Sequence, residues 1–219
     1  MPINRLLAGY RSYKALYHEK RAEMTLRLAE QGQHPAILVI ACSDSRVDPA
    51  ILFNADPGEI FVVRNVAALV PPYEPDGGHH GTSSAIEYAV KDLKVEEIII
   101  LGHHKCGGIQ AMRSIVSGEV EDDHEFIGDW MKLAQEACSM HGADDPSSGA
   151  SVEMATIKLS IRNLKSFPWI TERVKAGKLR LHGWWFDIQT GNLLAHDPRT
   201  GQFSVIERVE PHGHTAIDA

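Results

Sequence analysis

One stretch decides the fold of this chain: Ala36-Ile37-Leu38-Val39-Ile40-Ala41-Cys42-Ser43-Asp44-Ser45-Arg46. Its first six residues are apolar and partly β-branched, and the turn-forming residues Ser43 and Asp44 follow them closely. This pattern predicts a short buried strand over residues 36–41 that ends at a polar turn. The turn carries a thiol, a carboxylate and a guanidinium, from Cys42, Asp44 and Arg46.

A second apolar run is also followed by a turn with reactive side chains. Residues 97–101 predict a buried strand, and Gly102-His103-His104-Lys105-Cys106-Gly107-Gly108 follows it. Ligands bind beyond the carboxyl ends of strands in open α/β sheets, so we expect the turns after both strands to converge. Two thiolates and one imidazole, from Cys42, His103 and Cys106, form a ligand set that suits Zn²⁺.

The fourth position of this predicted zinc site depends on Asp44 and Arg46. If Arg46 holds the Asp44 carboxylate away from the metal, the position is open and the site can be catalytic. If Asp44 binds the metal instead, the site is closed. Cys138 has no role in this interpretation, and His79 and His80 are weak candidates for a proton relay.

The rest of the chain alternates apolar strands with amphipathic helices, which predicts an α/β fold with a mostly parallel sheet covered on both faces. An antiparallel strand at one edge fits the turn at residues 189–192. The expected helices span residues 4–31, 83–93, 109–117, 122–140 and 152–167, and the expected strands span residues 36–41, 59–64, 97–101, 179–187 and 193–196.

Composition sets the class of protein. The 219 residues predict one domain, 43% of them are hydrophobic, and the formal net charge of −7 argues against nucleic acid as a partner. We find no signal-type N-terminus and no apolar run of membrane-spanning length, and three cysteines favour metal binding over a disulfide framework. A soluble, cytoplasmic protein with no membrane partner is expected.

The two motifs, with Asp56-Pro57-Gly58-Glu59 and Val63-Arg64-Asn65-Val66-Ala67 between them, closely resemble the β-class carbonic anhydrases over about residues 26–186. The resemblance implies Zn²⁺ held by two cysteines and one histidine, beside a dyad of Asp44 and Arg46. It implies a four-stranded parallel core, an antiparallel edge strand, helices on both faces and a long N-terminal helix that packs on a second subunit. The single domain, 1–219, would then comprise a helical arm (1–31), a zinc-site core (32–120) and C-terminal helices with an edge hairpin (121–219).

Individual residues make the plant-type subtype the better match. Gln33 resembles the glutamine with which plant-type members hydrogen-bond the substrate, and Phe61 and Tyr88 resemble the wall of that pocket, which both protomers build. The other subtype has a tryptophan three residues before the first cysteine, where this chain has Val39. The resemblance therefore implies an open, water-ligated zinc. Asp92 stands where plant enzymes can carry a proton-transfer histidine.

The mechanism that follows is reversible hydration of CO₂ to bicarbonate and a proton by attack of zinc hydroxide. Asp44 would accept a hydrogen bond from the hydroxide while Arg46 keeps Asp44 charged. Gln33 and the backbone amide of Gly107 would donate to the developing oxyanion. The apolar pocket for CO₂ would be lined by Phe61, Val66 and Tyr88. Self-association as a dimer or a higher even oligomer is expected.

Three alternatives stay open. A hydrolase of carbonyl sulfide or carbon disulfide could use the same zinc and fold, because both molecules are linear like CO₂. A structural zinc module that binds a partner would prefer four closed ligands, which leaves Arg46 beside Asp44 without a purpose. A thiol enzyme could use Cys42 as nucleophile, activated by Arg46, although anion-binding loops of that kind place their arginine further along the chain.

Overall fold

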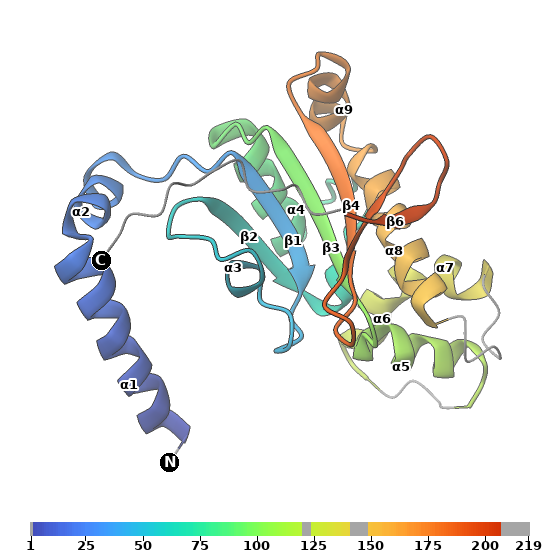
Figure 1. The fold of residues 1–219 in the computed structure, drawn as a ribbon. Coiled ribbons are helices and arrows are strands. Elements are labelled where there is room, and N and C mark those ends of the chain that lie inside the picture. Colours follow the sequence, from blue (N-terminus) through green and yellow to red (C-terminus); the bar gives the residue numbers. More distant parts are fainter. Residues whose placement is uncertain (1, 120–123, 141–148, 207–219) are drawn as a thin grey trace.

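The computed structural model describes residues 2–119, 124–140 and 149–206. Its centre is a six-stranded sheet with the order β2-β1-β3-β4-β5-β6 (Figure 1). Four neighbouring strands are parallel: β1 (Ile37–Cys42), β2 (Ile60–Asn65), β3 (Glu97–His103) and β4 (Arg180–Phe186). Two antiparallel strands follow at one edge: β5 (Leu193–His196) and β6 (Phe203–Val205).

The predicted parallel core with an antiparallel edge is confirmed, with two differences. The edge holds two antiparallel strands instead of one, because the chain turns at residues 197–202 and β6 pairs with β5. A three-residue strand with two exposed residues has too little apolar pattern to be predicted. In addition, β1 and β3 extend further than predicted, so Cys42 and His103 are the last residues of their strands and do not lie on the turns that follow.

Helical segments surround the sheet. The predictions for residues 83–93, 109–117 and 152–167 are confirmed with shifted ends. The predicted helix over residues 122–140 is wrong as one element, because three short segments replace it and residues 120–123 lie outside the described residues. The segments are α1 (Pro2–Lys14), η1 (Ala15–Lys20), α2 (Ala22–Gln31), α3 (Pro49–Leu52), η2 (Val66–Ala68), α4 (Gly81–Glu87), η3 (Tyr88–Asp92), α5 (Gly107–Val116), α6 (Ile127–Met131), η4 (Lys132–Ala134), α7 (Gln135–Met140), α8 (Gly149–Leu164) and α9 (Pro168–Lys175).

The two central strands, β1 and β3, are buried on both faces, which explains why their sequences are mostly apolar. Leu38 and Ile40 of β1 face one core, in which α4, η3, α8 and α9 pack on the sheet. Val39 and Ala41 face the opposite side, where α3 contributes Leu52. Each of these four β1 side chains is 0% exposed. Burial of a leucine or isoleucine at such a site stabilises the fold by roughly 1.5–3 kcal/mol.

Helix α8 approaches β4 closely because Gly183 has no side chain. A Cβ at Gly183 would lie 2.7 Å from Cγ2 of Ile157 and 2.8 Å from Cδ1 of Ile161, both on α8. Gly102 of β3 meets Ile157 in the same way, with 2.6 Å to Cδ1. The glycines thus allow α8 to lie directly over β3 and β4, next to the carboxyl edge of the sheet.

The N-terminal arm is formed by α1, η1 and α2, and α1 extends away from the sheet (Figure 1). The predicted helix over residues 4–31 is confirmed as helical, but it is interrupted at Arg21, whose φ of −117° and ψ of 35° are not helical. Arg21 Nη1 donates to both carboxylate oxygens of Asp56 at 2.7 Å, which joins the arm to the turn before β2. Several apolar side chains of the arm are exposed: Ile3, Leu6, Leu7, Tyr10, Tyr13, Leu16 and Leu26. Among the helices described, none has the length and apolar character that crossing a membrane requires.

Candidate metal centre

The candidate metal centre lies at the carboxyl edge of the sheet, between β1 and β3. Cys42 ends β1 and His103 ends β3, and these two strands are direct neighbours with Ala41 opposite Leu101. The strand order reverses here, because β1 is followed by β2 on one side and by β3 on the other. Open parallel sheets bind their ligands at such switch points. Cys106 comes from the turn after β3 and caps the N-terminus of α5.

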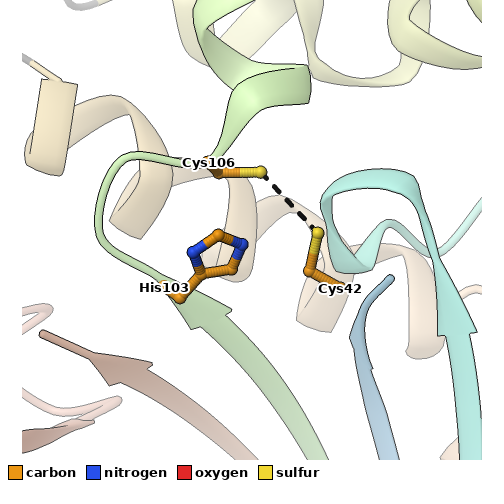
Figure 2. Close-up of side chains that lie close together, drawn as sticks. All are labelled: Cys42, His103 and Cys106. Carbon is orange, nitrogen blue, oxygen red and sulfur yellow. Dashed lines mark hydrogen bonds between the residues drawn. The ribbon is translucent and has the colours of Figure 1, made fainter. Parts of the chain in front are cut away.

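The structure brings the three predicted ligands together. The metal-binding atoms of Cys42, His103 and Cys106 all lie within 4.8 Å of one another, and Figure 2 shows the two thiols and the ring gathered around one point. The side chains are 5%, 1% and 3% exposed, respectively. The two Sγ atoms are 3.9 Å apart, far beyond the S–S bond length, so both cysteines are free thiols.

His103 has the tautomer that a metal ligand needs. Its Nδ1 lies 3.0 Å from the carbonyl oxygen of His104, and a carbonyl can only accept, so Nδ1 carries the proton. Its Nε2 is buried and has no hydrogen-bond partner among the described residues. A buried nitrogen lone pair without a partner is costly, and a metal ion satisfies it. The donor set therefore fits a divalent metal.

Backbone amides surround the two sulfur atoms. The Asp44 amide donates to Cys42 Sγ at 3.4 Å, and Ala67 belongs to the buried cluster that contains both cysteines. The hydrogen bond from the Cys106 thiol is the main cause that lowers the pKa of Cys42, to about 4, and the same contact raises the pKa of Cys106. Two sulfurs this close ionise together only with a cation between them, so the pair favours a metal.

Asp44 lies beside the three ligands, and its carboxylate accepts two hydrogen bonds from the Arg46 side chain. Arg46 donates from Nε to Oδ1 at 2.9 Å and from Nη2 to Oδ2 at 2.7 Å, and its Nη2 also donates to the Lys105 carbonyl at 2.9 Å. The Arg46 hydrogen bonds hold the pKa of Asp44 well below its usual range. Asp44 Oδ2 is 3.8 Å from Nε2 of His103, so the carboxylate borders the site without belonging to the group of mutually close ligand atoms.

Arg64 holds the turn that carries Cys42 and Asp44, a role that sequence reasoning missed. Its guanidinium donates to the carbonyl oxygens of Cys42 at 2.9 Å and Asp44 at 2.7 Å, and to Asp48 Oδ2 at 2.6 Å. The signal that could have revealed this role is the position of Arg64 in the Val63–Ala67 motif, because an arginine inside a half-buried strand needs several acceptors.

Glu153 is a second residue that sequence reasoning missed. It is only 5% exposed, and it accepts hydrogen bonds from the Cys106 amide and from Trp185 Nε1, both at 3.0 Å. Burial raises the pKa of its carboxyl group. Glu153 is 47 residues from Cys106 in the chain, and no local pattern predicts the contact.

Four of the predicted substrate-binding residues form two groups, and the fifth, Gln33, lies in a loop. Near the metal ligands, Val66 packs on the cluster that contains Cys42 and Cys106, and Gly107 is the exposed first residue of α5. Gln33 is exposed in the loop between α2 and β1.

Phe61 and Tyr88 form the other group. Their ring centroids are 5.9 Å apart, and Phe61 lies opposite Leu38, four residues before Cys42 along β1. With a rise of about 3.3 Å per residue, this places Phe61 roughly 13 Å along the strand from the Cys42 end. The structure does not bring Phe61 and Tyr88 to the metal ligands of their own chain.

Comparisons with known proteins agree with this geometry. Residues 37–193 match the family described as carbonic anhydrase. The β carbonic anhydrase 3 of Arabidopsis thaliana is 34% identical over 198 residues, which cover 87% of this chain and 75% of that protein. The structure of the β-carbonic anhydrase CcaA superposes with a TM-score of 0.85 at 29% identity, covering 94% of this chain and all of that chain. A tetrameric β-carbonic anhydrase of Sordaria macrospora gives a TM-score of 0.77 at 26% identity, covering 93% and 98%.

The matched residues contain all three predicted metal ligands, Asp44 and Arg46, and they span the whole parallel core. On the strength of this match over most of its length, the chain belongs to the β class of the carbonic anhydrase family of enzymes.

Proposed function

We propose that this enzyme catalyses the reversible hydration of CO₂ to bicarbonate and a proton, with Zn²⁺ held by Cys42, His103 and Cys106. One observation carries the proposal: three buried ligand atoms meet at one point while Arg46 holds the neighbouring carboxylate of Asp44 in two hydrogen bonds. A tetrahedral metal with three protein ligands keeps one position for water, and Zn²⁺ in such a site makes water a nucleophile near neutral pH.

Asp44 orients the attacking water in this proposal. The carboxylate is kept ionised by Arg46, so it can accept a hydrogen bond but not donate one. Accepting a hydrogen bond from the attacking oxygen would leave a lone pair of that oxygen directed at the carbon of CO₂. Arg46 thereby has two roles, because it keeps Asp44 charged and also holds it away from the metal. This arrangement supports the open, plant-type subtype.

The start of α5 and the turn after β2 form the near wall of the proposed substrate pocket. Gly107 opens α5, and an amide in the first turn of a helix has no acceptor within the helix. That amide can therefore donate to the oxygen on which negative charge develops. Val66 supplies apolar surface next to the ligands, and Gln33 is proposed as a second donor to the substrate.

The far wall of the pocket is proposed to come from a second subunit. Phe61 and Tyr88 are remote from the metal ligands of their own chain, yet Tyr88 is 46% exposed and can therefore face a neighbour. The exposed apolar side chains of the N-terminal arm also need a surface to cover them. Both observations support a dimer in which each protomer completes the site of the other. The tetrameric assembly of the Sordaria macrospora relatives supports a dimer or a higher even oligomer.

Stopped-flow CO₂ hydration, measured together with metal content, tests the proposal. We expect turnover that requires about one zinc per chain and disappears when a chelator removes the metal. The same preparation is assayed with carbonyl sulfide and carbon disulfide. Faster turnover of either would replace CO₂ hydration with the hydrolase alternative. Stoichiometric zinc without turnover of any of the three substrates would favour a structural zinc module instead.

A further inference from the structure

The turn after β2 contains two residues in an unusual backbone conformation beside the metal ligands. Ala67 and Ala68 have φ angles of 67° and 53°, in the left-handed region that residues with a Cβ disfavour. Both are buried, with 7% and 1% of their surface exposed. Backbone strain of this kind persists only where the surrounding structure enforces it, and it gathers at functional sites.

The side chain of Asn65 bridges this turn from end to end. Its Oδ1 accepts a hydrogen bond from the Leu69 amide at 2.9 Å, and its Nδ2 donates to the Leu69 carbonyl at 2.8 Å. Nδ2 also donates to Thr82 Oγ1 on α4 at 3.2 Å. Both backbone groups of Leu69 are thereby tied to one amide side chain, and residues 66–68 have to close the loop between them.

Two further donors satisfy the carbonyl groups inside the turn. Trp130 Nε1 donates to the Val66 carbonyl at 2.8 Å, and Ser160 Oγ donates to the Ala68 carbonyl at 3.4 Å. Ala67 itself belongs to the buried cluster that contains Cys42 and Cys106. Ala67 also lines a small cavity with His103 and Cys106, so the turn reaches the metal ligands themselves.

We propose that Asn65 is a positioning residue for the metal centre: by bridging the turn it holds Ala67 in the left-handed conformation that places Ala67 beside His103 and Cys106. Contacts behind metal ligands fix the positions of the ligand side chains. Asn65 therefore sets how tightly the centre binds a metal and how its ligands are arranged. The inference rests on the metal site of the proposed function.

The test compares Asn65→Ala with the double variant Asn65→Ala/Ala67→Gly. Glycine adopts positive φ without a steric cost, so it can keep the turn left-handed after the bridge is lost. We expect Asn65→Ala to weaken zinc binding by about 10–100-fold, measured by chelator competition. In the cobalt-substituted protein the sulfur-to-cobalt absorption band should change its position, because the ligands are no longer held in the same arrangement. The double variant should recover most of the affinity and most of the band position.

Thr82→Val is the matched control, because it removes the other partner of Asn65 Nδ2 and leaves the bridge to Leu69 intact. It should bind metal as the unaltered enzyme does. An unaltered enzyme that binds no metal at the three ligands would refute the proposed function. Normal binding by the unaltered enzyme, with unchanged affinity and band in Asn65→Ala, would refute this inference alone. So would a double variant that is no better than Asn65→Ala, because a merely structural role of Asn65 predicts no rescue by glycine.

If Asn65→Ala does not fold, Asn65→Asp replaces it. The carboxylate keeps an acceptor for the Leu69 amide but cannot donate to the Leu69 carbonyl, so half of the bridge remains. A smaller loss of affinity and a smaller band shift are then expected, and unchanged values of both would overturn the inference.

Discussion

Arg46 contacts both carboxylate oxygens of Asp44, with Nε 2.9 Å from Oδ1 and Nη2 2.7 Å from Oδ2. A fork of two parallel hydrogen bonds fixes the plane of the carboxylate as well as its charge. The same guanidinium reaches the Lys105 carbonyl at 2.9 Å, so it connects the turn after β1 to the turn after β3. The side chain that holds the Asp44 carboxylate thus also connects the two segments that carry Cys42 and Cys106.

Arg46→Ala should release Asp44, which can then turn toward the metal and occupy the open position. We expect CO₂ hydration to fall by about 10–100-fold, the range typical for loss of an outer-shell contact, while zinc content stays the same. Stopped-flow assays with metal analysis measure both. Arg46→Lys is the control, since a lysine keeps the charge but loses the fork, and it should retain intermediate activity. Full activity in Arg46→Ala would show that Asp44 does not need this partner.

Cys106→Ser should lose most of its zinc, because a serine hydroxyl is a poor substitute for a thiolate ligand. The loss of affinity should exceed the roughly 10–100-fold that an outer-shell contact contributes. Cys138→Ser is the matched control: Cys138 is a buried free thiol on α7 that is not among the three clustered ligands. Metal analysis should give full zinc for Cys138→Ser. Equal zinc in both variants would remove Cys106 from the ligand set.

Removal of the metal should make Cys42 the thiol that reacts first. The neighbouring Cys106 thiol lowers the pKa of Cys42 to about 4, whereas burial raises the pKa of Cys138 to about 11. At pH 7, above the first value and below the second, Cys42 is a thiolate and Cys138 a thiol, and only the thiolate is nucleophilic. Mass spectrometry after iodoacetamide should find Cys42 alkylated in the metal-free protein and protected in the zinc form. Alkylation of Cys42 with zinc bound would instead support the thiol-enzyme alternative.

Much of the fold is predictable from the sequence because the two central strands, β1 and β3, are buried on both faces. A continuous apolar run such as residues 36–41 has no competing interpretation as an amphipathic helix, and a polar turn marks its end. The gathering of Cys42 and His103 follows from the same pattern, because parallel neighbours end at one edge of the sheet. The arm is less predictable: its helical pattern continues through residue 21, whereas in the structure the helix is interrupted at Arg21, which binds the distant Asp56.

The support around the metal ligands is harder to predict, because it depends on contacts between distant segments. Glu153 lies on α8 and binds the Cys106 amide, and nothing in its local sequence distinguishes it from a surface carboxylate. The left-handed conformation at Ala67 is equally hidden, because alanine at positive φ contradicts the local preference and only Asn65 and its neighbours enforce it. Local rules fail at functional sites for this reason.

Gly183→Ala should destabilise the fold by about 1–3 kcal/mol, because the added methyl group overlaps the Ile157 side chain of α8. The Ile157 Cγ2 atom, 2.7 Å from where that methyl group would lie, is attached to a β-branched carbon and cannot swing away freely. Urea unfolding of the metal-free protein measures the change. Gly81→Ala is the control, since no atom lies within 4 Å of a Cβ there. Equal stability of the two variants would mean that α8 can move away from β4 at little cost.

Two inactive variants should restore activity to each other if each protomer completes its partner's site. Cys42→Ser removes the metal but keeps Phe61 and Tyr88, while Phe61→Ala/Tyr88→Ala keeps the metal and loses the wall. In a mixed dimer one site then combines an intact metal centre with an intact wall. Random exchange makes about half of the dimers mixed, with one competent site in each, so activity should return to about a quarter of the unaltered level. A mixture of Cys42→Ser with Cys106→Ser is the control and should stay inactive, because neither chain holds the metal. If the first mixture also stays inactive after subunit exchange is verified by native mass spectrometry, Phe61 and Tyr88 do not serve the site of the partner.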